Sequence, residues 1–370
     1  MKKAKIILLV ILIISLKLTA QVNRPNLIHT CATKTPATAL RFSTAQMAAA
    51  ERNINYQYIL NIYVHILRND DGTNAATNLT QLNIDLTRMA DFFKPHNICF
   101  LLVGVDSINN TTLNTNMDVF NNFEVAVLKS YNQHAGAINI YVHTNIISNP
   151  SVGGRTYDLP GNTISIKQSA NFNFEHEMGH ALGLYHTFET AFGEECPDGT
   201  DCDGDGDLIC DTPADFKNSP AHITGTNYCT YIADTATNCG SILTPDIQLF
   251  RPLTNNIMSY WSHCYSEFTA YQGIRMRVTL ENEPIVHQCL LPADAVLYAA
   301  NGDVIVNYDW FYTAKNEVTI GSPQGTGIVR IIDGGPKKIY AGSKIRLIPG
   351  TIISPVNSST ILTVTNVFCD

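Results

Sequence analysis

The pattern of apolar and polar positions predicts that the folded region begins with a strand, a helix and two further strands. Residues 58–67 alternate β-branched and aromatic positions, which is typical of a β-strand. Residues 79–93 carry an apolar side chain at every third or fourth position and follow Asn78, a good helix N-cap, so they predict an amphipathic helix. Residues 98–105 and 137–142 are continuous apolar runs, which indicate buried strands.

The same pattern continues into a pair of short strands and a second helix. Residues 153–159 and 163–166 are strand-like and are separated by Pro160-Gly161. A helix is expected to start near Phe174. The predicted order of elements is therefore strand, helix, strand, strand, strand, helix.

The character of the chain changes at about residue 291. Strand-like runs alternate there with Gly, Pro, Asn and Asp turns, at 304–308, 327–332, 344–347 and 359–364. Short strands at such spacing favour a small all-β domain over residues 291–370. These residues contain no pattern typical of a metal site or a nucleophile, so the role of this domain stays open.

The N-terminus has the features of a processed leader. Residues 1–20 combine a basic start, an apolar run and a small-residue end, which predicts a cleavable signal peptide. Residues 21–52 are rich in Thr, Ala, Asn and Pro and indicate a prosegment, which leaves 53–290 as the catalytic domain. No later segment has eighteen apolar residues in a row, so no membrane span is expected. We expect a secreted protein, extracellular or, in a bacterium, periplasmic.

Residues 176–186, H-E-M-G-H-A-L-G-L-Y-H, carry the chemistry. His176 and His180 are four apart and share one face of a helix, and Gly183 allows the chain to turn so that His186 becomes a third ligand. Three neutral imidazoles leave an open position on zinc for a water molecule. Glu177 is then placed to take the proton of that zinc-bound water as general base and to return it as general acid.

Charge excludes one class of partner and points to a cation. The chain has 24 Lys+Arg and 32 Asp+Glu, and loss of the four signal-peptide lysines leaves 20 basic against 32 acidic residues, a net charge of −12. Nucleic acid is therefore not expected as a partner. Ten of the acidic residues lie between Glu189 and Asp215 with no Lys or Arg among them. Such a cluster needs a counter-ion if it is folded; a solvated acidic loop is the alternative.

The extended histidine motif is the signature of the metzincin metalloproteases, which also require a methionine-containing turn. Asn255-Asn256-Ile257-Met258-Ser259-Tyr260 supplies such a turn. The succession L-Y-H-T-F, G-D-L-I-C-D-T-P and N-I-M-S-Y, followed by Cys264, Phe268-Thr269, Gln272 and Arg275-Met276, resembles the pappalysin family of metzincins. The order strand, helix, strand, strand, strand, helix is that of the upper half of a metzincin, so the resemblance implies an α+β fold with a twisted mixed sheet, an active-site helix and a Met-turn subdomain. It also implies a secreted zinc endopeptidase, commonly calcium-dependent, that cuts proteins or peptides. It gives neither the natural substrate, nor the cleavage-site preference, nor the oligomeric state.

The resemblance also implies roles for individual residues. Met258 would be a structural floor under the histidines, and Tyr260 would stabilise the oxyanion of the tetrahedral intermediate. Residues 153–159 would be the edge strand that pairs antiparallel with substrate, although a plain loop is the alternative. Cys31 would be a cysteine switch that keeps the zymogen inactive, although the residues around it depart from the family pattern and a disulfide partner or an idle thiol remains open.

The acidic stretch opens like an EF-hand loop but does not close like one. D-x-D-x-D-G begins at Asp201, yet the twelfth position is Thr212 instead of glutamate. The resemblance to pappalysins implies a different calcium site, with Asp207 and Thr212 as ligands. Zn²⁺ and Ca²⁺ are thus the expected cofactors.

All ten cysteines follow the signal peptide, as expected in an oxidising compartment. The family resemblance implies the pairs Cys196–Cys239 and Cys229–Cys264. Two further pairs follow from chain order: Cys202–Cys210, which encloses the Asp-rich insert, and Cys289–Cys369, which brackets the tail. Cys99 would then be a buried free thiol, although sequence alone does not fix connectivity.

Two other functions remain open at this level. A secreted binding or adhesion protein would retain the zinc site only as a vestige and act through its β domain. Glu177 argues against that, because zinc binding alone needs no adjacent carboxylate. A zinc hydrolase of a non-peptide bond is the other alternative, and the expected edge strand argues against it.

Overall fold

The computed structural model describes residues 30–53, 56–147, 151–168, 173–215, 223–224, 230–231, 250–260, 265–298, 304–306, 310–321, 328–332, 337–348, 351–354 and 360–364. The predicted signal peptide, residues 1–20, lies outside these ranges. Within them, every helix is too short or too polar to cross a lipid bilayer.

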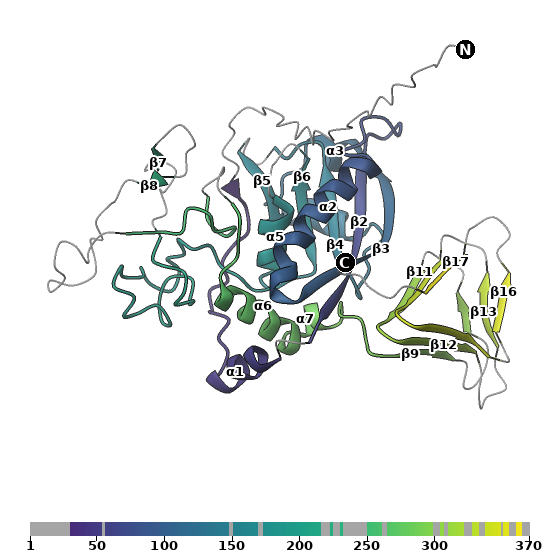
Figure 1. The fold of residues 1–370 in the computed structure, drawn as a ribbon. Helices are drawn as coiled ribbons and strands as arrows, with labels where there is room; N and C mark the ends of the chain where they lie inside the picture. Colours follow the sequence, from purple (N-terminus) through teal and green to yellow (C-terminus); the bar gives the residue numbers. More distant parts are fainter. Residues whose placement is uncertain are drawn as a thin grey trace, which may run out of the picture.

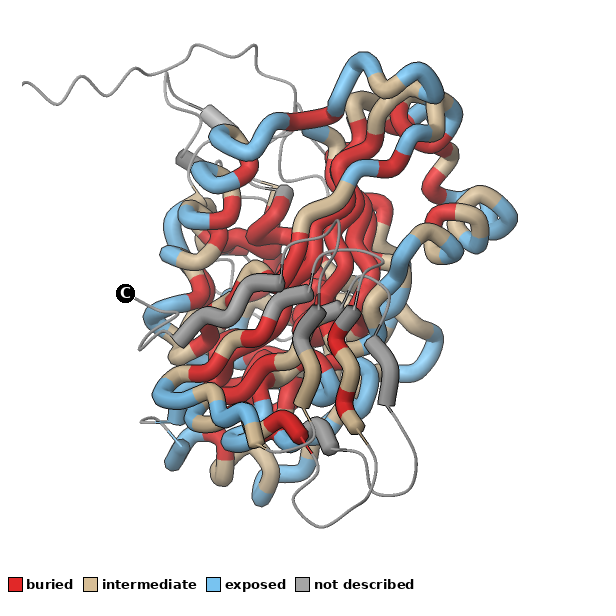
Figure 2. Tube along the Cα trace, turned by 90° about the vertical axis from the view of Figure 1, so that its right-hand side faces the viewer, coloured by how far each residue is buried: buried red, intermediate tan, exposed pale blue. Residues whose placement is uncertain are grey.

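A mixed six-stranded sheet forms the centre of the molecule (Figure 1). Its order is β1-β5-β6-β4-β2-β3, and only β5 and β6 pair antiparallel. The strands are β1 (Thr30–Cys31), β2 (Tyr58–Arg68), β3 (Ile98–Asn109), β4 (Ile138–His143), β5 (Val152–Thr156) and β6 (Thr163–Lys167). Every residue of β4 and β5 is buried, so the middle of the sheet belongs to the core (Figure 2).

The helices cover and connect this sheet. They are α1 (Thr44–Arg52), α2 (Leu79–Phe93), the 3₁₀ turn η1 (Lys94–His96), α3 (Thr111–Thr115), α4 (Asn122–Lys129), α5 (Asn173–Ala181), α6 (Ala270–Asn282) and α7 (Pro284–His287). Helix α2 buries Leu82, Leu86, Met89 and Phe93, four of the five positions in the stripe that its sequence predicts, whereas the first position, Leu79, is exposed. The mixed sheet and its helices therefore confirm the α+β prediction.

A long loop and a run of strands complete the described chain. Strands β7 (Ile223–Thr224) and β8 (Thr230–Tyr231) form a hairpin beyond α5. The later strands are β9 (Ala295–Tyr298), β10 (Val304–Val306), β11 (Trp310–Ala314), β12 (Glu317–Gly321), β13 (Val329–Ile332), β14 (Lys337–Ala341), β15 (Lys344–Leu347), β16 (Thr351–Ser354) and β17 (Thr360–Val364).

In the described part of this C-terminal region the strands pair in three parallel sheets, β15-β12-β9, β10-β13-β16 and β11-β14-β17. The chain visits the three sheets in turn and repeats this path, as in a parallel β-helix. Phe311 and Tyr340 pack on a buried cluster of the central sheet that includes Ile59 and Tyr63. The C-terminal strands thus share a core with the catalytic region, and their status as a separate domain stays a prediction.

Two predictions about cysteines are wrong. Cys99, expected to be a free thiol, is disulfide-bonded. Cys289, expected to pair with Cys369, is a free thiol. It is fully buried just after α7, and its Sγ lies 3.7 Å from the carbonyl oxygen of Ile285, because the residue faces the core of the catalytic region and not the tail.

Candidate metal centre

Helix α5 presents His176 and His180 on one face, one helical turn apart. The helix ends at Ala181, and Gly183 follows with φ of +88°, a left-handed conformation that glycine adopts without strain. A Cβ at this position would also meet the Thr279 side chain at 2.6 Å. The turn at Gly183 brings His186 back to the same face, as its sequence position predicts.

The three imidazoles converge on one point. Each pair of Nε2 atoms among His176, His180 and His186 is 3.2 Å apart. Nδ1 of His176 lies 2.8 Å from the carbonyl oxygen of Ile257, and Nδ1 of His180 lies 2.8 Å from that of Leu184. A ring that donates from Nδ1 to a carbonyl keeps its Nε2 lone pair free. At least two lone pairs therefore face one another, an arrangement that needs a cation between them.

The spacing of these nitrogens fits zinc. Tetrahedral ligands at roughly 2.0–2.1 Å from the ion lie roughly 3.3–3.4 Å from one another. Burial lowers the pKa of His176 to about 4, and burial together with repulsion from His176 lowers the pKa of His180 well below its ordinary value. Both rings are thus neutral at physiological pH, the form in which imidazole binds a metal.

Glu177 lies beside the histidines and is buried, with 1% of its surface exposed. Its Oε2 accepts hydrogen bonds from the hydroxyls of Thr33 at 2.8 Å and Thr156 at 3.0 Å. Burial raises the pKa of Glu177 to about 7, against the lowering effect of these donors. A carboxyl group poised near neutrality can both accept and return a proton.

Met258 and Tyr260 contact this centre in different ways. Met258 is fully buried against α5, and a Cβ added to Gly179 would come within 2.5 Å of its Sδ. The ring of Tyr260 lies 5.1 Å from that of His186, centroid to centroid. The structure therefore brings both predicted residues to the histidine cluster, the methionine as packing and the tyrosine with its hydroxyl on the side of Cys31.

The N-terminal segment covers the centre. Ligand atoms of Cys31 and the three histidines all lie within 4.8 Å of one another. Strand β1 pairs parallel with β5, and Tyr260 Oη accepts a hydrogen bond from the backbone N–H of Cys31 at 3.0 Å. The predicted edge strand is thus a real strand, over Val152–Thr156, but in this structure its edge is occupied by β1.

The acidic loop forms a second, separate cluster. Asp207 is fully buried, and both of its carboxylate oxygens lie 2.9 Å from the Thr212 hydroxyl. Burial raises the pKa of Asp207 to about 8. Glu195 is 5% exposed, its Oε2 has no hydrogen-bond partner, and burial followed by repulsion from Asp207 raises its pKa to about 9.

Sequence reasoning missed several residues around both clusters. Thr33 and Thr156 contact Glu177 but are too common a residue type to stand out, although Thr33 follows Cys31 at a fixed short spacing. Glu195 is one of the ten acidic residues between Glu189 and Asp215, and it belongs to no motif that distinguishes it from the others. Glu175, also buried, binds Arg88 of α2 at 2.6 Å and ties the metal-site helix to α2. The signal for that pair was only the adjacency of Glu175 to His176.

One predicted disulfide is present, and the cysteines of several others lie outside the described residues. Cys202 and Cys210 are bonded, with Cα atoms 4.9 Å apart, as the sequence predicts. Cys196 is also disulfide-bonded. Its predicted partner Cys239, the predicted pair Cys229–Cys264 and Cys369 lie outside the described residues.

Comparison with known proteins agrees with this geometry. The model of peptidase family M43, described as pregnancy-associated plasma protein-A, matches residues 116–281. An extracellular metalloprotease of Sordaria macrospora is 26% identical over 255 residues, 64% of this chain and 78% of that protein. One from Colletotrichum graminicola is 28% identical over 234 residues, 58% of this chain and 73% of that protein.

Among solved structures, metalloproteinase-II from Bacteroides fragilis aligns with a TM-score of 0.28 and 11% identity, over 40% of this chain and 52% of that chain. This likeness is too low to support an argument. The family match and the curated relatives do not depend on it: over residues 116–281 the chain is similar to the pappalysin family, and it is a metalloprotease.

Proposed function

We propose that this chain is a secreted zinc endopeptidase, made as a zymogen, that hydrolyses peptide bonds in proteins. The observation that carries the proposal is that three histidine Nε2 atoms lie 3.2 Å from one another. The buried carboxylate of Glu177 follows the first of these histidines, His176, in the same helix. The fungal relatives are named extracellular metalloproteases, which supports secretion, as does the leader pattern of residues 1–20.

His176, His180 and His186 would hold the zinc ion. Zinc, when bound, supplies a Lewis acid and lowers the pKa of water. The carbonyl oxygens of Ile257 and Leu184 would orient the ligands. They would accept hydrogen bonds from the Nδ1–H groups of His176 and His180, respectively. Met258 supports the helix from below, in the role of the methionine turn of the family.

Glu177 would carry the proton. Its carboxylate accepts a proton from the attacking water and passes it to the nitrogen of the departing amine, so that no net proton is consumed at the site. The Thr156 hydroxyl contacts both the backbone carbonyl of Glu177, at 2.7 Å, and its carboxylate, and so fixes the carboxylate relative to β5. Tyr260 would donate a hydrogen bond from its hydroxyl group to the developing oxyanion.

Strand β5 would align the substrate. Its free edge offers backbone N–H and C=O groups to an extended peptide, as in strand addition. In the structure these groups are taken by the N-terminal segment: Ala32 N–H donates to the carbonyl oxygen of Gly154 at 2.9 Å, and Thr156 N–H donates to the Thr33 hydroxyl at 2.8 Å. Removal of this segment would therefore open the strand to substrate.

The same contacts support latency. Cys31 faces the three imidazoles, Thr33 donates to Glu177, and Tyr260 contacts the backbone of Cys31. One short segment thus faces the metal position and contacts the base, the oxyanion donor and the substrate strand. Cys31 would act as a cysteine switch that the enzyme loses when residues 21–52 are cleaved.

The acidic loop would bind calcium. Asp207, Thr212 and, in addition to the sequence prediction, Glu195 present oxygen atoms to one another inside the loop, and oxygen is the ligand that calcium takes. The unpartnered Oε2 of Glu195 supports this assignment, because a buried carboxylate oxygen without a donor is costly. The strands from β9 onward would form an all-β accessory domain.

Chelation tests the proposal. The protein from which residues 21–52 have been cleaved and separated should digest casein, lose this activity with a zinc-specific chelator, and regain it when zinc is restored in a calcium-containing buffer. Digestion that continues in the zinc-free protein would contradict the assignment of the metal centre.

A further inference from the structure

We propose that the face of α6 covered by residues 40–52 is a peptide-binding surface that holds this segment independently of the metal centre and retains it after the maturation cut. We call residues 40–52 the anchor and residues 30–33 the plug. The inference rests on the proposed zymogen function and adds to it a second binding site with its own ligand.

Two buried polar groups clamp the start of the anchor. The backbone N–H of Leu40 donates to Tyr185 Oη at 2.7 Å, and Arg275 Nη2 donates to the carbonyl oxygen of Leu40 at 2.9 Å. Arg275 is 4% exposed and also donates from Nε to the carbonyl oxygen of Gly183 at 2.8 Å. Because a buried guanidinium without acceptors is costly, this site favours an extended peptide with a free carbonyl oxygen.

Helix α6 receives the end of the anchor in the same way. Nε and Nη2 of Arg277 each lie 3.3 Å from the carbonyl oxygen of Ala50. Ala50 is fully buried in a small cluster with Ile274 and Val278, and Met47 packs against that cluster. Small side chains on α1 let the two helices approach closely, so the surface selects a helix with alanine on its inner face.

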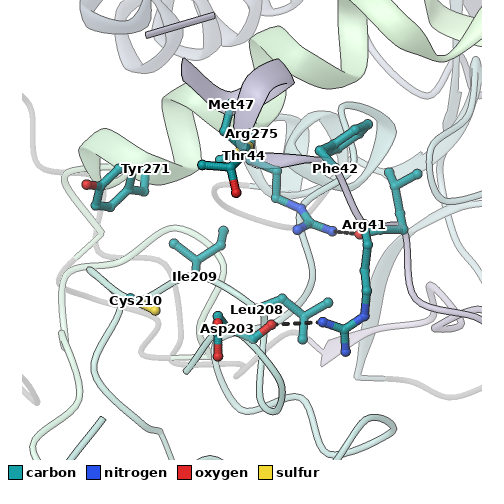
Figure 3. Close-up of a pocket in the computed structure, with 11 residues that line it drawn as sticks. Arg41, Phe42, Thr44, Met47, Asp203, Leu208, Ile209, Cys210, Tyr271 and Arg275 are labelled. Carbon is teal, nitrogen blue, oxygen red and sulfur yellow. Dashed lines mark hydrogen bonds between the residues drawn. The ribbon is translucent and has the colours of Figure 1, made fainter. Parts of the chain in front are cut away.

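A cavity of about 490 Å³ lies beside the first of these contacts, where Leu40 meets Arg275 (Figure 3). Arg41 bridges its rim, where it donates to the carbonyl oxygens of Asp203 and Gly204 at 2.8 and 2.9 Å. The guanidinium of Arg275 lies 5.9 Å from the ring centroid of Phe42. The walls come from both sides: Leu40, Arg41, Phe42, Thr44 and Met47 from the anchor, and Asp203, Leu208, Ile209, Cys210, Tyr271 and Arg275 from the remainder of the chain.

None of these anchor contacts includes a histidine of the metal centre or Glu177. Plug and anchor are therefore two ligands on one chain, joined by residues 34–39. Linking two binding sites makes the second binding event intramolecular. The overall affinity can then exceed that of either site alone by roughly 10²-fold or more. The anchor would thus keep the plug in place, and after cleavage it would hold the freed segment on the enzyme as an inhibitor.

The test uses the full chain with Glu177→Ala, so that the protein does not cut itself, and a site for a sequence-specific protease inserted after Asn53. After cleavage, size-exclusion chromatography and mass spectrometry show whether the N-terminal fragment stays with the rest. We expect retention with and without zinc. Ala50→Glu should release the fragment, whereas Ala45→Glu, which adds the same charge at an exposed position of α1, should not.

A synthetic peptide of residues 39–53 removes any effect of the substitution on folding. Added in excess, the peptide should displace the fragment from the parent protein, and so should its Ala45→Glu form. The Ala50→Glu peptide should bind at least about tenfold more weakly, because it would bury an unpaired carboxylate.

Release of the parent fragment on zinc removal would overturn the proposal, since the plug alone would then hold it. Equal binding of the two glutamate peptides would overturn it as well. Retention does not require catalysis, so failure of the casein assay would count against the proposed function and not against this surface.

Discussion

The two ligand clusters of this chain solve opposite problems. In the metal centre the ligands are neutral imidazoles, which burial keeps neutral by lowering their pKa. In the acidic loop the proposed ligands are carboxyls, and burial raises the pKa of Asp207 to about 8 and of Glu195 to about 9. The first cluster is prepared for its ion without net charge. The second becomes stable at neutral pH only when protons or a cation neutralise it.

Because of this difference, we expect the metal centre to determine activity and the acidic loop to determine the stability of the fold. Loss of zinc from the metal centre should remove activity, because the ion supplies the Lewis acid, and should weaken the fold less than loss of calcium does, because the imidazoles carry no charge. Loss of calcium from the acidic loop should weaken the fold as the pH approaches 8 to 9, because two buried carboxyls would then have to ionise without a counter-charge.

The sharpest test of the metal-centre half is Glu177→Ala. The variant should lose casein cleavage by roughly 10²–10⁴-fold, the usual contribution of a general base. Its zinc content, measured by atomic absorption, should equal that of the parent, because the histidines alone hold the ion. Unchanged cleavage would refute the role of Glu177, and loss of zinc would show that the carboxylate is a ligand.

Tyr260→Phe should have a smaller effect. Removal of one oxyanion donor costs up to roughly 10²–10³-fold in kcat. Because the ring and its packing remain, KM should change little. Equal kcat values for parent and variant in steady-state kinetics would leave Tyr260 as a packing residue only.

The acidic-loop half predicts a pH dependence of stability. In the folded chain Asp207 and Glu195 have pKa values of about 8 and about 9, above their ordinary values of 3.8 and 4.5. The folded state therefore binds protons more tightly than the unfolded state. This stabilisation is fully present below about pH 4 and is lost as the pH rises to about 9. The Tm of the metal-free protein should fall over this range.

Calcium should reverse this loss. At pH 9 the ion should raise Tm by at least roughly 4 °C, and at pH 5 by less, because protons then compete for the same oxygens. Differential scanning calorimetry of the parent and of Asp207→Asn measures both effects, and the variant should show the weaker pH response. A Tm that is independent of calcium at every pH would remove the calcium assignment.

The smallest effect is expected at Thr33. Thr33→Val keeps the shape of the side chain but removes the hydroxyl that donates to Glu177 and accepts from Thr156 N–H. Loss of such contacts costs on the order of 1–2 kcal/mol, so the activity of the uncleaved zinc-loaded chain should rise roughly five- to thirtyfold. Thr33→Ser, which keeps the hydroxyl, should stay latent. If the valine variant is equally latent, Cys31 alone maintains inhibition.

Local patterns were sufficient for elements that are stabilised along their own length. Helix α2 occupies Leu79–Phe93 as predicted, because its apolar stripe and the Asn78 cap, which accepts a hydrogen bond from the Gln81 N–H, agree with each other. The histidine spacing likewise predicted a convergence that Gly183 completes.

Elements that depend on distant partners were not predictable. Strand β1 has two residues and exists because it pairs with β5, more than 120 positions away. Helix α1 has a capping box of Ser43 and Gln46, but its alanine-rich face gives little periodic signal until α6 is placed against it. The pairing state of Cys99 and Cys289 depends on the same long-range packing, which the order of cysteines along the chain does not report.

The parallel pairing of β1 with β5 has one more consequence. A substrate that lies antiparallel to β5 runs across the zinc site with one polarity, and residues 30–33 run across it with the other. A backbone laid in reverse presents its carbonyl groups in the wrong order to the catalytic side chains, so residues 30–33 are poorly suited to be cut by the molecule that carries them. Cleavage within this segment should then require an encounter between two molecules, and its lag should shorten as the protein is concentrated.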